Sequence, residues 1–174
     1  ISLFCAQLMQ ALGRIIEPEI LDTYFTVGLF HSIGKIVIDS YLRKRGLLLY
    51  AEEDIDRQGQ IDVLPEIENK ILGFNHAEAG AAFLEFWQFP QLISEPIRCQ
   101  LRPELADATF VKISLALYFS RSIPVPPKTG DDVTGEPALL SDIADALDLE
   151  KANLMDCVSE AKEEFVKIRS QVLS

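Results

Sequence analysis

The chain has 174 residues, of which 48% are hydrophobic, and its formal net charge is −11. This length suffices for one domain with a buried core, and the hydrophobic content predicts a folded chain rather than a disordered one. The acidic excess argues against binding to nucleic acid or to an anionic membrane surface, because both need clusters of basic residues. The basic run Arg43-Lys44-Arg45 is soon followed by acidic residues, and we interpret it as a solvated helix end.

The three cysteines, Cys5, Cys99 and Cys157, lie far apart in the sequence. Without a Cys-x-x-Cys pair, they predict neither a structural zinc site nor a disulfide framework, and we expect reduced thiols in a cytoplasmic protein. No signal peptide is recognisable, and the apolar runs are too short to span a membrane. Ile1 already stands in a helix-like pattern, so we expect a longer polypeptide whose missing portion lies upstream.

The first half of the chain has a helical pattern. A first helix is predicted to end near Arg14, and Pro18 suits the first position of the next one. Apolar and small residues then recur at helical spacing at Val27, Phe30, His31, Gly34 and Ile38. This spacing predicts one long, largely buried helix that carries the run GLFHSIGK and stops before Gly46.

The middle of the chain predicts shorter elements. Residues 47–50 form an apolar run that suits a strand or a helix, and residues 52–62 have the polar composition of a loop. Pro65 is predicted to open a short helix, and Gly73 is placed to end it with a left-handed cap.

Asn75 and Glu78 form a capping-box pattern at the start of the next predicted helix. The large aromatic side chains that follow in this helix are expected to fill core: Phe83, Phe86 and Trp87.

The last third also reads as helical. Pro90 is predicted to open a helix that reaches Cys99, and Pro103 a longer, mostly buried one. Residues 123–137 are rich in Pro, Gly and acidic side chains, which is typical of an exposed loop. Ser141 is predicted to cap a short helix. A final helix from about Glu150 carries one apolar stripe: Leu154, Cys157, Val158, Ala161, Phe165, Ile168 and Val172.

Three segments in this order carry a family resemblance: GLFHSIGK, GFNHAEAGAAFLEFWQFP and EPIRCQLRPEL. Together they resemble the HDOD (HD-related output domain) family, a degenerate relative of the HD-domain metal-dependent phosphohydrolases. That family shows a G-L-L-H-D-I-G-K-like helix, then H-x-x-x-G with a trailing W-x-x-P, then a helix ending in I-x-x-H-H. Residues 1–123 are similar to the C-terminal portion of such a domain, its N-terminal part being absent.

The resemblance implies an all-α, HD-domain-like helical bundle. Residues 124–138 are then a Pro/Gly-rich acidic loop, and residues 139–174 a helical extension that packs on the same domain. The resemblance also implies a role in bacterial signal transduction, since such domains are commonly joined to, or act beside, receiver, GGDEF and EAL modules.

The ligand set of the HD enzymes looks incomplete. Such an enzyme needs several His and Asp ligands for a metal that activates water and polarises a phosphoryl oxygen. By the resemblance, His31 matches the first residue of the His-Asp doublet, Ser32 stands where Asp is expected, and Gln100 and Leu101 stand where relatives have His-His. His76 lies at a helix start. We therefore predict no metal site, no cofactor and no catalytic residue, although the resemblance leaves enzymatic activity open.

The leading hypothesis is a non-catalytic regulatory module that binds a signalling protein partner, or a second copy of itself, through the last helix and the 123–137 loop. A second hypothesis is a metal-dependent phosphohydrolase with a divergent site. A third is a sensor that binds a nucleotide or other small ligand in the old HD cleft, which these residues would line: His31, Ser32, Lys35, His76 and Gln100.

Simpler interpretations exist for the same side chains. His31 suits a hydrogen-bonded core histidine, and His76 a packed residue at a helix start. Lys35 suits a snorkelling side chain. Three acidic residues could assist a weak metal site but are more simply explained by helix N-termini: Glu66, Glu68 and Glu78.

Overall fold

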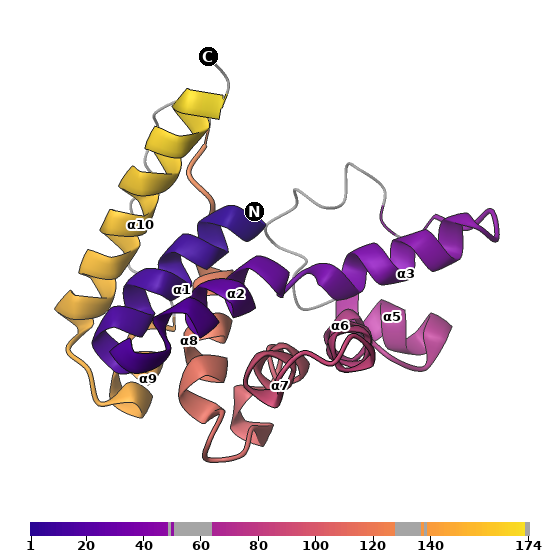
Figure 1. Cartoon of the computed structure of the whole chain (residues 1–174), viewed down its shortest axis with the longest axis horizontal. Coiled ribbons are helices and arrows are strands. Elements are labelled where there is room, and N and C mark those ends of the chain that lie inside the picture. The colour runs from indigo at the N-terminus through magenta and orange to yellow at the C-terminus, as the bar shows by residue number, and fades with distance from the viewer. Residues whose placement is uncertain (49, 51–63, 128–136, 138, 173–174) are drawn as a thin grey trace.

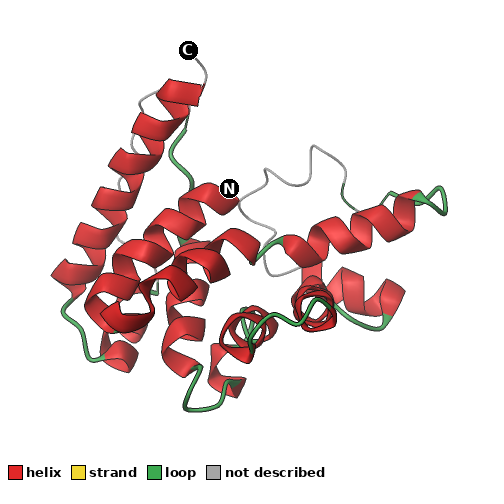
Figure 2. Ribbon diagram, viewed as in Figure 1, coloured by secondary structure: helices red, strands yellow, loops and turns green. Residues whose placement is uncertain are grey.

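The computed structural model describes residues 1–48, 50, 64–127, 137 and 139–172. Within these residues every regular element is a helix (Figure 2), so the all-α prediction is confirmed. The α-helices are α1 (Ser2–Ile16), α2 (Leu21–Phe30), α3 (Ile33–Arg43), α5 (Leu64–Leu72), α6 (His76–Phe86), α7 (Gln91–Arg98), α8 (Val111–Ser122), α9 (Leu140–Leu147) and α10 (Lys151–Val172). Two short 3₁₀ helices, η1 (Pro18–Ile20) and η2 (Pro103–Leu105), precede α2 and α8.

The main core is built around α1, which packs against α2, α8 and α10 (Figure 1). α1 and α2 lie very close, because a Cβ atom on Gly28 would be only 2.7 Å from the Cα atom of Ala6. Large apolar side chains of α1, α2 and α8 fill this core: Phe4, Leu8, Leu12, Tyr24, Leu117 and Phe119. α1 is apolar on several sides, which is typical of a buried helix and not of an amphipathic surface helix.

The C-terminal helices share the same core. Leu140 and Ile143 of α9 and Leu154 and Phe165 of α10 are buried in it, and the Phe165 ring meets the Phe4 ring edge to face at 5.6 Å. The apolar stripe of the last helix is therefore covered by the domain itself from Leu154 to Phe165. The predicted loop over 123–137 lies largely outside the described residues.

A smaller assembly of α3, α5 and α6 extends away from the main core (Figure 1). Its interior is a second, small apolar cluster in which Ile38, Leu42 and Tyr50 are buried. α3 and α6 cross closely at glycines, since a Cβ atom on Gly34 would lie 1.8 Å from the carbonyl oxygen of His76. α7 packs on α6, α2 and α8, and so links the two assemblies.

The long helix predicted through GLFHSIGK is broken in two. α2 ends at Phe30, and α3 begins at Ile33 after a turn at His31 and Ser32. In a continuous helix the Gly28 carbonyl would accept a bond from the amide of residue 32. Here it accepts a 2.7 Å hydrogen bond from Nδ1–H of His31. Periodicity could not reveal this side-chain competition, because both halves keep helical spacing.

The aromatic end of α6 also departs from expectation. Phe86 and Trp87 are 80% and 62% exposed, so they do not fill core. They contact each other instead, with ring centroids 6.0 Å apart. Helical spacing places both beyond the buried face that Ala77, Ala81 and Leu84 form.

Two helix starts were predicted wrongly. After Pro103 the chain forms only the short η2, and α8 begins at Val111. α9 begins at Leu140 without a side-chain cap, so Ser141 lies inside its first turn rather than capping it. The loop predicted over 52–62 lies outside the described residues.

Other local predictions are confirmed. Gly73 has φ = 80° after α5, the left-handed conformation that glycine adopts without strain. The Asn75 side chain accepts hydrogen bonds from the amides of Ala77 and Glu78, and the Glu78 carboxylate accepts one from the Asn75 amide. These signals are local, so the sequence suffices to predict them. In the described part of the chain, no helix is long and apolar enough to cross a membrane.

Candidate functional site

His31 lies at the turn between α2 and α3 and is 6% exposed. Because a carbonyl oxygen only accepts, the 2.7 Å contact with Gly28 places the proton on Nδ1 of the imidazole. Burial lowers the pKa of His31 to about 3, and the nearby cations Arg121 and Lys35 act in the same direction. His31 is therefore a neutral, hydrogen-bonded histidine inside the bundle.

Ser32 occupies the position at which the HD pattern has Asp. Its Oγ atom lies 2.7 Å from the Oγ atom of Ser2, at the start of α1. The two hydroxyls share one hydrogen bond across 30 residues of sequence. The side chain thus fixes the α2–α3 turn to α1 and brings no negative charge.

Gln100 is fully buried and follows the end of α7. Its side-chain Nε2–H donates to the backbone carbonyl of His31 at 3.0 Å, and the backbone carbonyl of Gln100 accepts from the Arg121 guanidinium at 2.7 Å. The Gln100 amide therefore ties the end of α7 to the α2–α3 turn. Leu101, the second position of the family's His-His pair, is half-buried and has no donor atom.

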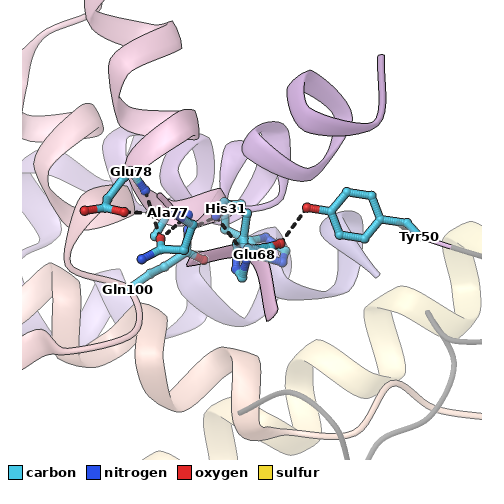
Figure 3. Close-up of polar contacts among 8 residues, drawn as sticks. His31, Tyr50, Glu68, Ala77, Glu78 and Gln100 are labelled. Carbon is cyan, nitrogen blue, oxygen red and sulfur yellow. Dashed lines mark hydrogen bonds and ion pairs between the residues drawn. The ribbon is translucent and has the colours of Figure 1, made fainter. Parts of the chain in front are cut away.

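His76 is the first residue of α6 and is bound to a buried carboxylate from α5. Oε2 of Glu68 accepts two hydrogen bonds from His76, from the backbone amide at 2.8 Å and from Nδ1–H at 2.7 Å. Oε1 of Glu68 accepts one from the Tyr50 hydroxyl at 2.5 Å. Figure 3 shows Glu68 between Tyr50 on one side and His31 and Gln100 on the other.

The protonation states follow from these contacts. Burial alone would raise the pKa of Glu68, but the hydrogen bonds that its carboxylate accepts from His76 and from the Tyr50 hydroxyl bring that pKa below its ordinary value. Burial lowers the pKa of His76 further than Glu68 raises it. The pair is thus an ionised carboxylate with a neutral imidazole that donates through Nδ1.

Two cations lie near these groups. The Lys35 ammonium, on α3, is half-buried; burial lowers its pKa, as does Arg121, whereas Glu68 raises it. Lys35 and Arg121 also lower the pKa values of both histidines, which places their charges close to the two rings. Of the five predicted pocket residues, Gln100 bonds to the His31 backbone, Ser32 bonds to Ser2, and Lys35 follows Gly34, the residue of α3 that packs against the His76 backbone.

The donors present do not fit an HD-type metal centre. His76 donates through Nδ1 to a carboxylate, as metal-ligating histidines usually do, and its buried Nε2 atom has no hydrogen-bond partner among the described residues. However, Ser32 and Gln100 are neutral: Ser32 bonds to Ser2 and Gln100 donates through Nε2 to His31, while the buried Oε1 atom of Gln100 has no hydrogen-bond partner among the described residues. In the described part of the chain, no three His, Cys, Asp or Glu side chains are arranged to hold one ion. No reaction step through a metal follows from this arrangement.

The sequence offered Glu68 only as one of three acidic residues that could assist a weak metal site, and its buried bonds to His76 and Tyr50 were not predicted. Helix N-terminal charge explains Glu66, which is exposed, and Glu78, which caps α6. It does not explain Glu68, which faces inward while Ile67 and Ile71 of the same helix are 40% and 56% exposed. An apolar stripe on α5 predicts the opposite orientation. One sequence signal could have identified this pair: a titratable residue, Glu68, lies eight residues before His76.

The family model described as HDOD domain matches residues 1–103. The chain belongs to the HDOD domain family. A solved structure described as that of a putative phosphohydrolase from Shewanella amazonensis SB2B has a TM-score of 0.62 and 20% sequence identity, and the alignment covers 93% of this chain and 60% of that one. No curated protein matches the chain.

These likenesses confirm the HD-domain-like helical bundle. At 20% identity the structural match shows the fold alone, and the chain spans 60% of the length of that solved structure. The HDOD match places the His31 turn, the Glu68–His76 pair and Gln100 inside the family domain, whereas α8, α9 and α10 lie beyond the matched residues.

The first prediction concerns the Glu68 carboxylate. Glu68→Gln replaces an oxygen that accepts with an NH₂ group that donates, so at least one hydrogen bond from Tyr50 or His76 is lost inside the fold. We expect a loss of about 3 kcal/mol in the free energy of unfolding. Urea denaturation measures it, with Glu66→Gln on the exposed face of α5 as the matched control. Equal stability of the two variants would contradict the assignment.

The second prediction concerns pH. The folded chain holds His31 with a pKa of about 3, whereas an unfolded histidine titrates near pH 6.5. Between these values the unfolded state binds more protons, so stability falls as the pH falls, by up to about 1.4 kcal/mol per pH unit for this residue. The pKa of His76 is also lowered, so its contribution has the same sign.

Urea midpoints measured from neutral pH down to about pH 5 report this effect above the range in which carboxylates dominate. His31 and His76 are the only two histidines in the chain. His31→Gln should flatten the dependence while retaining a side chain that can donate to Gly28. A midpoint that stays constant or rises on acidification would show that His31 is not buried as a neutral group.

Proposed function

We propose that this HDOD domain is a non-catalytic regulatory module that acts by binding a protein partner in a signalling pathway. The proposal rests on one observation, which is what the residues at the family's metal-ligand positions bond to in this chain. Ser32 bonds to Ser2, and Gln100 bonds to the His31 backbone, so both serve the internal packing of helices. A neutral hydroxyl and a neutral amide are also poor substitutes for the charged and imidazole ligands of a catalytic metal.

The surface supports binding of another protein. Phe86 and Trp87 are strongly exposed at the end of α6, and the structure provides no core for them. Ile67, Ile71 and Phe74, on and just after α5, add exposed apolar area within the same assembly. Exposed aromatic side chains of this size are typical of interaction sites. The stripe of α10 is less suitable than the sequence suggested, because the core already covers it from Leu154 to Phe165.

The two alternatives have less support. A divergent phosphohydrolase needs further ligands beside His31 and His76, and those positions hold Ser32, Gln100 and Leu101. A sensor in the old cleft needs room beside the histidines. His31, His76 and Gln100 are each at most 6% exposed, and the α3–α6 crossing at Gly34 leaves no space for even a methyl group.

Hydrolysis assays test the non-catalytic part of the proposal. The chain, incubated separately with manganese, iron, zinc and magnesium, should hydrolyse nucleotides and phosphate esters no faster than the buffer does. Lys35→Met distinguishes the outcomes, since this residue would bind phosphate in an enzyme. Metal-dependent turnover that Lys35→Met abolishes would overturn the proposal and assign catalysis to this site.

Paired surface variants test the binding part. Phe86→Ser combined with Trp87→Ser should leave the thermal midpoint nearly unchanged, because both side chains are exposed. In the organism that encodes the protein, the double variant should no longer form the cross-links to a partner protein that the wild-type chain forms. It should also lose the signalling phenotype of the wild type. Leu105→Ser, at a position 65% exposed on η2, is the matched control. If both variants retained the wild-type phenotype and cross-links, the α6 surface would have no part in binding.

A further inference from the structure

The C-terminal end of α6 presents a cluster of three aromatic rings: Phe83, Phe86 and Trp87. The centroids of the Phe86 and Trp87 rings lie 6.0 Å apart with an angle of 87° between the ring planes, and those of Phe83 and Trp87 lie 6.2 Å apart. Phe86 and Trp87 are 80% and 62% exposed, so much of their ring surface faces solvent. This cluster therefore offers π surface that the fold itself does not cover.

A defined turn holds the cluster in this exposed position. Gln88 follows Trp87 with φ = 60°, in the left-handed region that glycine usually occupies at a helix end. The amides of Gln88 and Phe89 donate to carbonyls of α6 at 2.9 and 3.0 Å. Phe89 then packs edge to face on Phe30 at 5.5 Å, beside the main core. The backbone thus turns inward directly after Trp87, and the exposed rings belong to a bonded helix end.

The Trp87 ring has no cation over it in the part of the chain that the structure describes. Two other aromatic rings do have one: the Arg45 guanidinium lies 3.7 Å from the centroid of Tyr41, and that of Arg169 lies 5.6 Å from the centroid of Phe165. Tryptophan attracts cations more strongly than either of these rings. Trp87 is therefore an open position for a cation that another molecule supplies.

The charge around the cluster also favours a basic partner. The acidic residues of α5, α6 and α7 are Glu66, Glu68, Glu78, Glu85 and Glu95, and the basic ones are Lys70 and Arg98. Arg98 is already paired with both Glu85 and Glu95. The whole chain has a net charge of −11. This negative potential attracts a basic molecule and repels an acidic one.

The size of the cluster suits a short segment better than a second copy of the chain. Two large aromatic side chains bury about 500 Å² at most, whereas a standard interface buries about 800 Å² on each partner. We propose that Phe86 and Trp87 bind a short basic segment of a partner protein, with a Lys or Arg of that segment over the Trp87 ring. This inference rests on the proposed function, which assigns partner binding to the same surface.

Short blocked peptides that alternate Leu with Arg, with Gln or with Glu test this inference. Trp87 is the only tryptophan of the chain, so its fluorescence reports binding at this position directly. The arginine peptide should change the emission saturably and bind about fivefold more tightly than the glutamine peptide, and the glutamate peptide should not bind. Equal binding of the arginine and glutamine peptides, or no binding of the arginine peptide, would overturn the inference.

Trp87→Leu separates the ring face from apolar area and from net charge, because leucine is apolar and uncharged. Calorimetry should show about fivefold weaker binding of the arginine peptide by this variant, with Trp87→Phe in between. Tyr41→Leu is the matched control, since Tyr41 is 50% exposed but its ring is already covered by Arg45. It should bind as the wild type does. Undiminished binding by Trp87→Leu would show that net charge alone attracts the peptide, and the inference would fail.

Other occupants of this surface would give different results. A change in Trp87 emission with neutral phosphatidylcholine vesicles, but not with the arginine peptide, would indicate a membrane surface instead. A change on dilution of the protein alone would indicate a second copy. If Phe86→Ser with Trp87→Ser removed the cellular cross-links while the arginine peptide bound no better than the glutamine peptide, the proposed function would stand and only this inference would fall.

Discussion

The α3, α5 and α6 assembly depends on one buried carboxylate. Glu68 has no exposed surface, and an ionised group in that position is stable only if donors surround it. It accepts three hydrogen bonds, two from His76 at the start of α6 and one from Tyr50. The carboxylate thus sets the position of α5 against α6, orients the His76 ring, and fixes Tyr50 in the small apolar cluster with Ile38 and Leu42.

The rest of the site follows from how α3 meets α6. The glycine contact at Gly34 brings α3 within van der Waals distance of the His76 backbone. His31 and Lys35, which flank Gly34 in the sequence, therefore lie on the α3 side of His76. Gln100 then bonds the α2–α3 turn to the end of α7, and Ser32 bonds it to α1. This arrangement retains two histidines, His31 and His76, at positions that match an HD-type centre. At two other ligand positions it has the neutral side chains of Ser32 and Gln100, which bond within the protein. It supports a role as a rigid scaffold that presents its surface.

Local patterns predicted much of the fold. The Asn75–Glu78 capping box and the Gly73 cap need only neighbouring residues, and the resemblance of three segments to HDOD proteins gave the bundle. Features that depend on distant partners could not be predicted: the break at His31 comes from a side-chain bond to Gly28, and Glu68 is buried because Tyr50 and His76 meet it. Phe86 and Trp87 were misplaced because hydrophobicity alone does not tell a core position from an exposed one.

The central claim is that His31 and His76 are packing groups with their protons on Nδ1. Imidazole ¹H–¹⁵N NMR, recorded before and after addition of zinc or manganese, tests it most directly. The account predicts two neutral rings, each protonated on Nδ1 by its bond to Gly28 or Glu68, with nitrogen shifts that the metal leaves unchanged. Saturable zinc-dependent shifts, or manganese broadening, at Nε2 of both rings would contradict it, because they would show that the two histidines bind one ion together.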